Sequence, residues 1–245
     1  MLFDCIREGG IGQRRSIRIT RVLRVEFHCH SVFSKDCLVA PADLVACLSR
    51  KGVDRLVVTD HNTIDGGLAA QRLAPERIIV GEEIMTSRGE LLAAFVKTRV
   101  PPGLSPHETI ARLREQAAFI SVSHPFDVHR KGSWLEEDLL AILAQVDAIE
   151  TYNSRCIDPR QNERARRFAA KHGLAGTVGS DAHTCWEVGR STLWLPDFQN
   201  AADLRAVIRR GRGSTRWSPP WVRLSSRYAV LRKRLSAVLD TARAA

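Results

Sequence analysis

The sequence has no long run of apolar residues. No stretch approaches the ~18 apolar residues that a membrane-spanning helix requires, and the first twenty residues carry arginines but no apolar core of a secretory signal. The six cysteines include no C-x-x-C pair, and a chain of 245 residues with 44% hydrophobic residues can bury a sizeable core without disulfides. We therefore expect a soluble cytoplasmic protein with reduced thiols.

The net charge of +10 is unevenly distributed. From Leu204 onward there are eleven Lys and Arg residues and one acid, and residues 1–24 hold six arginines and two acids. The segment between them, residues 25–203, has twenty basic and twenty-four acidic residues. The basic character therefore belongs to the two ends, and a basic tail is more often a solvated face than a nucleic-acid-binding stripe.

Short runs rich in Val, Ile and Phe alternate with helix-like segments, which is typical of βα units around a largely parallel sheet. Seven strands are expected, at residues 22–28, 54–60, 77–84, 90–96, 118–124, 147–153 and 174–181. Helices are expected at residues 40–52, 105–116, 134–145 and 158–173. Seven strands with interleaved helices predict an α/β barrel of seven strands rather than an open sheet.

The C-terminal part breaks this alternation. Gly, Ser and Pro in residues 211–221 predict a linker, and residues beyond it follow a helical stripe with steps of four and three. The stripe consists of Leu224, Tyr228, Leu231, Leu235, Val238 and Ala242, and the basic residues off it are Arg223, Arg227, Lys233 and Arg234. We expect a basic amphipathic helix docked on the barrel or on a partner subunit, with contact to a membrane surface or to nucleic acid as the alternative.

Polar, chemically reactive residues stand at the ends of the expected strands. They are His28 with His30, Asp60 with His61, Glu83, His124, and Asp181 with His183. In a parallel barrel the C-terminal ends of the strands converge on one face, where active sites are built. A single histidine at such a position is most simply a packing residue, but five of the eight histidines share it, together with carboxylates.

The spacing of these residues favours metal binding. Residues i and i+2 of an extended segment point to the same side, so His28 and His30 can bind one cation, and Asp181 and His183 repeat this arrangement. Mixed histidine and carboxylate ligands suit Zn, Mn or Fe. Neighbouring divalent ions that share a carboxylate polarise a phosphoryl oxygen and lower the pKa of a bridging water, which indicates phosphoester hydrolysis.

The motifs "FHCHS", "TDHN", "GEEI", "SHP" and "GSDAH", in this order, resemble those of the PHP (polymerase and histidinol phosphatase) family of metal-dependent phosphoesterases, from about Val22 to about Leu195. The resemblance implies a distorted, TIM-like (β/α) barrel of seven strands over residues 22–210, with residues 1–21 as a basic leader and the linker and helix of residues 211–245 as an extension. It also implies a trinuclear metal site.

The resemblance assigns ligands to this site. It implies one metal on His28, His30, Glu83 and Asp181, a second shared by Glu83 with His124, and a third on Asp36, His61 and His183. Glu83 is chosen over Glu82 because the family pattern is Gly, any residue, Glu. The catalytic set is then His28, His30, Glu83, Asp181 and His183, with two to three divalent ions of Zn, Mn or Fe as cofactors.

One residue departs from the family pattern. Glu90 stands where the second metal usually has a further histidine, and it is either a harder ligand or a structural glutamate. Arg130 and Arg155 are candidates for binding the substrate phosphate, although on a surface this charged an exposed arginine is more often paired with a nearby acid. Trp186 is most simply a packing residue, but an aromatic side chain near the mouth of the site can stack a base.

Two functions remain open at this point. The first is hydrolysis of a phosphomonoester, a nucleotide or the end of an oligonucleotide by a metal-activated water, and the basic C-terminal helix favours a polyanionic substrate. The second is a non-catalytic metal-binding module that interacts through its basic ends. A structural site needs only four ligands, so eight strong ligand candidates favour the enzyme. The oligomeric state, a homo-oligomer included, does not follow from the sequence.

Overall fold

The structure is a computed structural model that describes the backbone of residues 21–244 and the side chains of residues 21–239. The predicted leader therefore lies outside the described residues, except for Arg21. One mixed sheet of nine strands runs in the order β7-β6-β5-β4-β3-β2-β1-β8-β9. The strands are β1 (Val22–Glu26), β2 (Arg55–Val58), β3 (Ile78–Met85), β4 (Glu90–Ala94), β5 (Phe119–Val122), β6 (Ala148–Asn153), β7 (Ala175–Gly179), β8 (Ser191–Pro196) and β9 (Arg212–Thr215).

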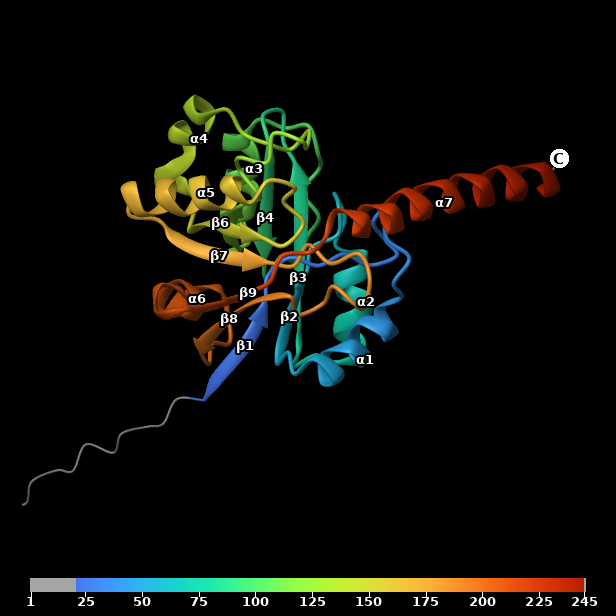
Figure 1. The fold of residues 1–245 in the computed structure, drawn as a ribbon, viewed down its shortest axis with the longest axis horizontal. Helices are drawn as coiled ribbons and strands as arrows, with labels where there is room; N and C mark the ends of the chain where they lie inside the picture. The colour runs from blue at the N-terminus through green and yellow to red at the C-terminus, as the bar shows by residue number, and fades with distance from the viewer. Residues whose placement is uncertain (1–20, 245) are drawn as a thin grey trace, which may run out of the picture.

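Helices cover the outside of this sheet. Figure 1 shows α3, α4 and α5 grouped beside β4 to β7, and α1 and α2 beside the first strands. The helices are α1 (Pro41–Lys51), α2 (Asp65–Leu73), α3 (Pro106–Glu115), α4 (Glu136–Ile142), α5 (Pro159–Lys171), α6 (Ala201–Val207) and α7 (Arg223–Ala244), with short 3-10 turns η1 (Leu143–Gln145), η2 (Ile208–Arg210) and η3 (Pro220–Val222). None of the helices among the described residues is both long and apolar enough to cross a membrane.

Local sequence signals explain where several helices begin and end. Pro41 occupies the first turn of α1, and Gly52 ends the helix in the left-handed conformation with φ of 63°. At α3, the Ser105 side chain accepts a hydrogen bond from the Glu108 backbone, and the Glu108 side chain reaches back to the Ser105 backbone. This capping box satisfies two of the backbone N–H groups that a helix start leaves free.

The sheet curves into a nearly closed barrel. Cys29, just beyond β1, forms an isolated parallel bridge with Ala182, just beyond β7. The His30 N–H donates to the Ala182 carbonyl at 2.9 Å, and the Asp181 N–H donates to the His28 carbonyl at 2.8 Å. The two ends of the seven-stranded run therefore meet at the edge where β1 and β7 end, which brings the first and last predicted ligands together.

The expected barrel class is confirmed, but the sheet has nine strands rather than seven. All seven expected strands form. β8 was missed because no helix separates it from β7, so it breaks the βα alternation used to find strands. β9 lies in the segment expected to be a linker, and all four of its residues are exposed, so it carries no apolar pattern.

The expectation of a largely parallel sheet is wrong for β4, which runs antiparallel to both β3 and β5. Only residues 86–89 join β3 to β4, and a parallel crossover needs a dozen or more residues, so a hairpin is the only solution. Thr86 closes this turn by donating its N–H to the Gly89 carbonyl at 3.0 Å. As a consequence, β4 brings its first residue, Glu90, to the edge where the neighbouring parallel strands end.

Helix α7 confirms the predicted C-terminal helix, but its apolar stripe does not dock on the barrel. The stripe residues from Leu224 to Val238 are 55–66% exposed. Figure 1 shows the second half of the helix extending away from the barrel. Polar contacts hold the helix to the barrel instead: Arg155 bonds to Ser226 and to the Val222 carbonyl, and Lys233 bonds to the Val32 and Ser34 carbonyls. Docking of the apolar stripe on a partner subunit stays a prediction.

Candidate metal centre

The first group of predicted ligands meets where β1, β3 and β7 end. His30 Nε2 lies 3.2 Å from Asp181 Oδ1 and 3.4 Å from Glu83 Oε2. His28 Nε2 lies 3.3 Å from Glu83 Oε1 and 3.7 Å from Asp181 Oδ1. All four side chains are fully buried. The structure thus brings together the four residues expected to share one metal.

A second group surrounds the same glutamate. His124 Nε2, at the end of β5, lies 3.1 Å from Glu83 Oε1 and 3.4 Å from Glu90 Oε2. Glu90 Oε1 lies 3.8 Å from His61 Nδ1. Glu90 therefore occupies a position from which its carboxylate reaches the ligand atoms around the second predicted metal.

A third group lies on the more open side of the cluster. Asp36 Oδ2 is 3.2 Å from His183 Nε2 and 3.6 Å from His61 Nε2, while His61 Nδ1 is 3.0 Å from Glu83 Oε2. Asp36 and His61 are partly exposed, whereas His183 is buried. This side is where a ligand from solvent would reach the cluster.

The chemistry of these atoms fits divalent cations. The buried nitrogens His28 Nε2, His30 Nε2 and His183 Nε2 and the oxygens Asp181 Oδ1 and Glu83 Oε2 have no hydrogen-bond partner. A buried polar atom without a partner costs free energy, so each points to a missing ligand. Metal–ligand bonds of about 2.0–2.1 Å in a tetrahedron put neighbouring ligand atoms about 3.3 Å apart, close to the distances above.

Further hydrogen bonds fix the orientation of the histidine rings. Glu150 Oε1 contacts His28 Nδ1 at 3.0 Å, the Ser34 hydroxyl contacts His30 Nδ1 at 3.1 Å, and the Asp181 carbonyl contacts His183 Nδ1 at 2.8 Å. Each contact occupies Nδ1 and leaves Nε2 facing the cluster, which is how metal-binding histidines are held in proteins.

Sequence reasoning missed the support built from serines. Ser34 donates to Asp60 at 2.6 Å, and Ser31 donates to the same carboxylate through its backbone at 2.7 Å and its hydroxyl at 2.5 Å. Asp60 is therefore a support for the loop that carries His30, not a ligand facing the cluster. The only sequence signal was the presence of two serines, Ser31 and Ser34, within four residues after "HCH". Serines are common in loops, so this signal did not indicate a role.

The carboxylates and imidazoles strongly shift one another's pKa. Burial alone would lower the pKa of His28, but Glu83, Glu150 and Asp181 raise it well above its ordinary value. Burial and the neighbouring rings of His183 and His61 lower the pKa of His30 to about 4. Burial and Arg155 also lower the pKa of His183. The lowered pKa values of His30 and His183 favour the neutral imidazole, which is the form that binds metals.

The pKa shifts of the carboxylates follow the same logic. Burial raises the pKa of Glu83, but His28 and His61 outweigh it and lower the value well below the ordinary range. Glu90 differs, because burial and the nearby Glu83 charge raise its pKa. Glu90 is thus the carboxylate that lacks sufficient positive charge around it, and a bound cation would supply that charge.

The two predicted substrate arginines differ in their surroundings. Arg130 NH1 lies 2.5 Å from Asp181 Oδ2, its Nε donates to Asp127 Oδ2 at 3.0 Å, and its side chain is 19% exposed. Arg155 is buried, and its guanidinium contacts Glu187 at 2.9 Å, His183 Nδ1 at 2.8 Å and the Val222 carbonyl at 2.9 Å. Arg130 can therefore still face a ligand, whereas Arg155 is occupied in holding the His183 loop to the start of α7.

Backbone features position two of the ligands. Asp181 adopts the left-handed conformation with φ of 53°, which Asp tolerates better than most residues. Gly179, at the end of β7, leaves no space for a side chain, because an added Cβ would collide with the His28 Cβ and the Glu150 carboxylate. Glu82, the alternative to Glu83, points away and accepts the Val100 N–H at 2.9 Å.

Sequence comparison places the chain among known proteins. A family model described as PHP-associated matches residues 159–212. An uncharacterized protein of Methanocaldococcus jannaschii, MJ0417, is 36% identical over 176 residues, which cover 70% of each chain. The chain belongs to the PHP family. This membership agrees with the resemblance carried by the five motifs.

Solved structures resemble the chain in fold at low sequence identity. A two-domain protein of Bacteroides vulgatus that contains a predicted PHP-like metal-dependent phosphoesterase is 21% identical, with a TM-score of 0.64 over 80% of this chain. The PHP-family chain spans 65% of that protein. Endonuclease Q, in complex with a 27-mer duplex that has an abasic lesion at the active site, is 14% identical, with a TM-score of 0.60 over 78% of this chain and 57% of its own length.

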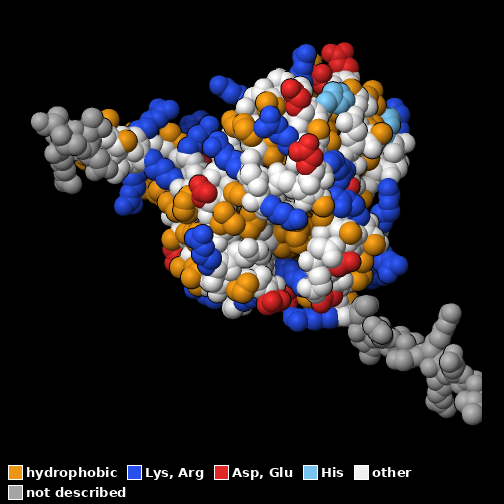
Figure 2. All heavy atoms as spheres, turned by 180° about the vertical axis from the view of Figure 1, so that it is seen from behind, with side chains coloured by type: hydrophobic (Ala, Val, Ile, Leu, Met, Phe, Trp, Pro, Cys, Tyr) orange, Lys and Arg blue, Asp and Glu red, His pale blue; other side chains and the backbone are white. Residues whose placement is uncertain are grey.

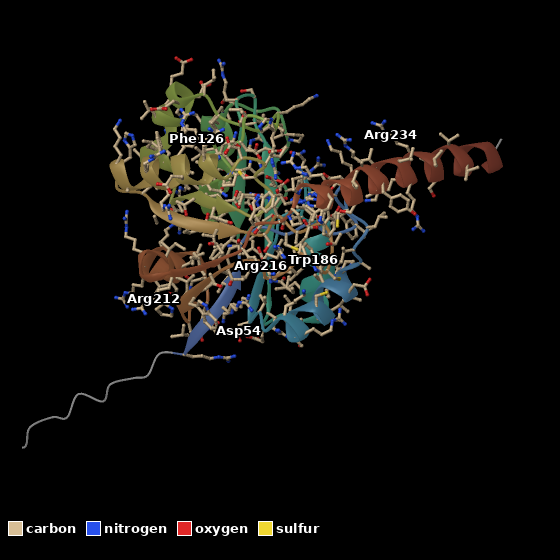
Figure 3. The ribbon with its side chains drawn as sticks, viewed as in Figure 1. Asp54, Phe126, Trp186, Arg212, Arg216 and Arg234 are labelled. Atoms are coloured by element: carbon tan, nitrogen blue, oxygen red, sulfur yellow. The ribbon has the colours of Figure 1, made fainter. Side chains whose placement is uncertain are left out.

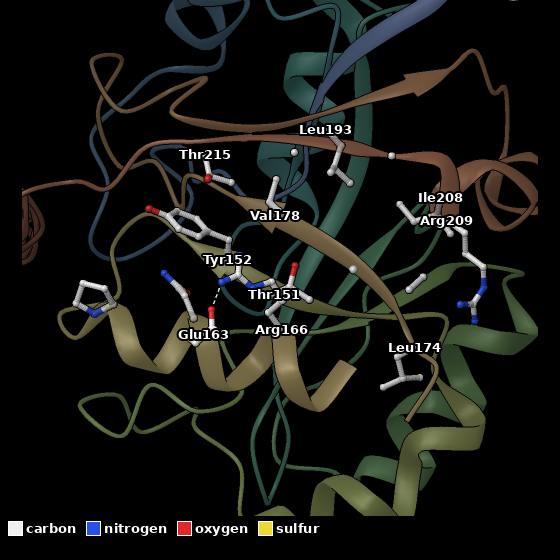
Figure 4. Close-up of a pocket in the computed structure, with 16 residues that line it drawn as sticks. Thr151, Tyr152, Glu163, Arg166, Leu174, Val178, Leu193, Ile208, Arg209 and Thr215 are labelled. Carbon is white, nitrogen blue, oxygen red and sulfur yellow. Dashed lines mark hydrogen bonds and ion pairs between the residues drawn. The ribbon is translucent and has the colours of Figure 1, made fainter. Parts of the chain in front are cut away.

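A well-formed cavity lies away from the cluster. It has a volume of about 530 Å³ and is lined by α5, β6, β7 and the β8–β9 region, including Tyr152, Arg166 and Thr215 (Figure 4). None of the nine predicted ligands lines it. The site of this PHP-family chain is therefore identified by converging polar atoms rather than by cavity size.

Proposed function

We propose that this chain is a hydrolase of phosphoric esters that uses two to three divalent ions of Zn, Mn or Fe. The observation that carries the proposal is the set of buried, unpaired ligand atoms that face one another across the cluster. Three-residue ligand sets have their atoms within 4.8 Å of one another, and Glu83 belongs to two of them. A carboxylate shared between neighbouring ions is the arrangement used in two-metal phosphoester hydrolysis.

The site residues have different roles in this proposal. His28, His30, Glu83 and Asp181 hold the buried part of the cluster, and Asp36, His61 and His183 hold the open part. Divalent ions held there supply a water that is nucleophilic at neutral pH and neutralise charge on phosphoryl oxygens. Arg130, beside Asp181, is placed to donate to a phosphoryl oxygen that enters from the open side.

Arg155 has a different role in this proposal. It contacts Glu187 at 2.9 Å, and Glu187 accepts the His183 backbone N–H at 3.2 Å, so Arg155 keeps the His183 loop in place and is a positioning residue rather than a direct phosphate ligand. The substrates that fit are a phosphomonoester, a nucleotide or a nucleic-acid strand. The likeness to endonuclease Q supports including phosphodiesters among them.

The test combines metal analysis with an activity assay. Protein purified without chelator should contain two to three metal ions per chain and, with added Mn, Fe or Zn, hydrolyse p-nitrophenyl phosphate or bis(p-nitrophenyl) phosphate. His28→Ala and Asp181→Ala should each lower metal affinity by on the order of 100-fold or more, because residues that only support ligands already contribute about 10–100-fold. His107→Ala, an exposed histidine bonded to Gln145, is the matched control.

A different outcome of the same experiments would refute the proposed hydrolase. One ion or none per chain, together with no turnover of any phosphoester, would leave a non-catalytic metal-binding module. Loss of activity in His107→Ala to the same degree as in His28→Ala would show that the assay reports folding rather than the site.

A further inference from the structure

Helix α7 borders the metal centre. At its start, the Arg223 guanidinium donates to the Arg155 carbonyl at 2.9 Å, and Ser226 contacts the Arg155 guanidinium at 3.1 Å. Two turns later, the Lys233 ammonium donates to the carbonyls of Val32 and Ser34, each at 2.5 Å. The first half of α7 is thereby tied both to the His183 loop and to the loop that carries Asp36.

A groove of about 400 Å³ runs between α7 and the Asp36 loop. Its walls are lined by Lys35, Asp36, Ser226, Arg227, Val230, Leu231 and Arg234. Asp36 also contacts His61 and His183 in the metal cluster. The groove therefore opens directly onto the partly exposed side of the cluster.

The groove contains cations without partners. Lys35, Arg227 and Arg234 are exposed, and none of them has a hydrogen bond or ion pair among the described residues. Arg223, at the start of the same helix, is by contrast bonded to the Arg155 carbonyl. Figure 2 shows Lys and Arg side chains gathered around the base of α7, and Figure 3 shows Arg234 projecting from it.

The spacing of these cations fits a chain of phosphates. Arg227 and Arg234 are seven residues apart, so they lie on one face of α7 about 10 Å apart along its axis. A stacked nucleic-acid strand rises 3.4 Å per nucleotide, so about three nucleotides span this distance. A single small phosphomonoester at the cluster would not reach the second arginine.

Two exposed indoles pack against each other near the start of α7. Trp186, three residues after His183, is 44% exposed, and Trp221, two residues before α7, is 58% exposed. Their rings pack against each other with centroids 5.3 Å apart, and Arg190 lies over the Trp186 ring at 4.3 Å. Proteins bind single-stranded nucleic acids by combining a cationic groove, which contacts the phosphates, with exposed aromatic rings, which stack on the bases.

We propose that the groove between α7 and the Asp36 loop binds the phosphodiester backbone of a single-stranded nucleic acid whose scissile phosphate lies at the metal cluster. Lys35, Arg227 and Arg234 bind phosphates, and the indoles of Trp186 and Trp221 stack a base. This inference rests on the proposed function, because it names the substrate class of the same site. A membrane surface fits less well, because the unpaired cations converge on a groove that ends at a metal ligand.

The first experiment measures binding without turnover. Fluorescence anisotropy of a labelled 12-nucleotide single-stranded DNA is measured in EDTA, for the full chain and for the double variant Arg227→Ala/Arg234→Ala. We expect the double variant to bind the DNA at least 10-fold more weakly. The slope of log affinity against log salt concentration should fall by the amount that corresponds to about two phosphate contacts. The control Arg212→Ala/Arg232→Ala removes the same charge from exposed residues outside the groove and should change affinity less than 2-fold. Trp221→Ala, which keeps the charge, should also weaken binding.

The second experiment separates this inference from the proposed function. The groove variant should hydrolyse bis(p-nitrophenyl) phosphate like the unchanged chain, but it should cleave the oligonucleotide at least 10-fold more slowly at subsaturating concentration. DNA binding equal in the groove variant and the control would overturn the inference, even with hydrolysis intact. Stronger binding to phosphatidylglycerol vesicles than to DNA would overturn it as well. Groove-dependent DNA binding without hydrolysis of any ester would support the groove and refute the proposed hydrolase.

Discussion

We expect Glu90 to influence how many metal ions the site binds. Its carboxylate lies 3.4 Å from His124 and 3.8 Å from His61, and no arginine or lysine of residues 21–239 is paired with it. Glu90→Gln keeps the shape but removes the charge, so we expect the most weakly bound ion to lose about 10–100-fold in affinity. Metal titration with elemental analysis checks this. Glu76→Gln, on an exposed glutamate, is the control, and an unchanged metal content in Glu90→Gln would assign Glu90 a structural role.

Gly179 holds the space in which His28 is oriented. Gly179→Ala places a methyl group against the His28 side chain and the Glu150 carboxylate, so His28 must move. We expect metal affinity to fall by on the order of 10-fold or more, with a folded protein that keeps its circular dichroism spectrum. Gly213→Ala serves as the control, because its added Cβ would meet atoms only at 3.8 Å or beyond. Equal metal affinity in both variants would contradict the inference that the close packing of Gly179 against His28 and Glu150 orients His28.

At this scale the sequence predicted which side chains meet in the cluster better than it predicted the groups that support them. His28, Glu83 and Asp181 carry a recognisable spacing, and the structure brings them together. The roles of Asp60 and Ser34 depend on which loop folds over which strand, and that information is tertiary. Arg155 shows the same limit, since its burial beneath α7 has no sign in the local sequence.

At the scale of elements, one aspartate joins three parts of the barrel. Asp147, just before β6, is bonded to Arg114 of α3 at 2.8 and 3.0 Å and to Arg205 of α6 at 2.9 Å. Its carboxylate also accepts the Ile120 N–H at 2.8 Å. Burial alone would raise its pKa, but the two arginines lower it below the ordinary value.

We expect Asp147→Asn to reduce the free energy of unfolding by about 1–3 kcal/mol at pH 7, since hydrogen bonds between charged groups contribute this much. The folded-state pKa of Asp147 is lowered, so its contribution is complete above the unfolded pKa of about 4 and is lost as the pH falls through the folded value. Urea unfolding of both proteins at pH 7 and at pH 3 checks this. A stability difference that stays constant or grows toward pH 3 would contradict the assignment.

The elements themselves were predictable where the pattern was local. The apolar runs predicted β1 to β7, and capping residues predicted the start of α3. The direction of β4 was not read from the sequence, although the four-residue spacer before it is a hairpin signal. β9 was unpredictable because its exposed residues pair with β8 through backbone groups, which every residue has.

At the scale of the whole molecule, metal binding should stabilise the barrel. The cluster joins residues of β3 and β4 to the ends of β1, β5 and β7, so ions bind the folded chain and not the unfolded one. At a concentration 100 times the Kd, each ion adds about 2.7 kcal/mol, which for a chain of this size raises Tm by about 5–10 °C. Differential scanning calorimetry with and without EDTA measures this. Equal Tm values, with His28→Ala unfolding at the same temperature, would argue against a loaded cluster.

The bridge between Cys29 and Ala182 also has a consequence for how the chain is made. It joins residues 153 positions apart, and contacts of such long range form slowly because the closing loop must first lose its entropy. A nascent chain exposes His28 and His30 long before the ribosome has added Asp181 and His183. We therefore expect tight metal binding to be among the last events of biogenesis. A tightly bound ion would then indicate that the barrel of that chain has closed.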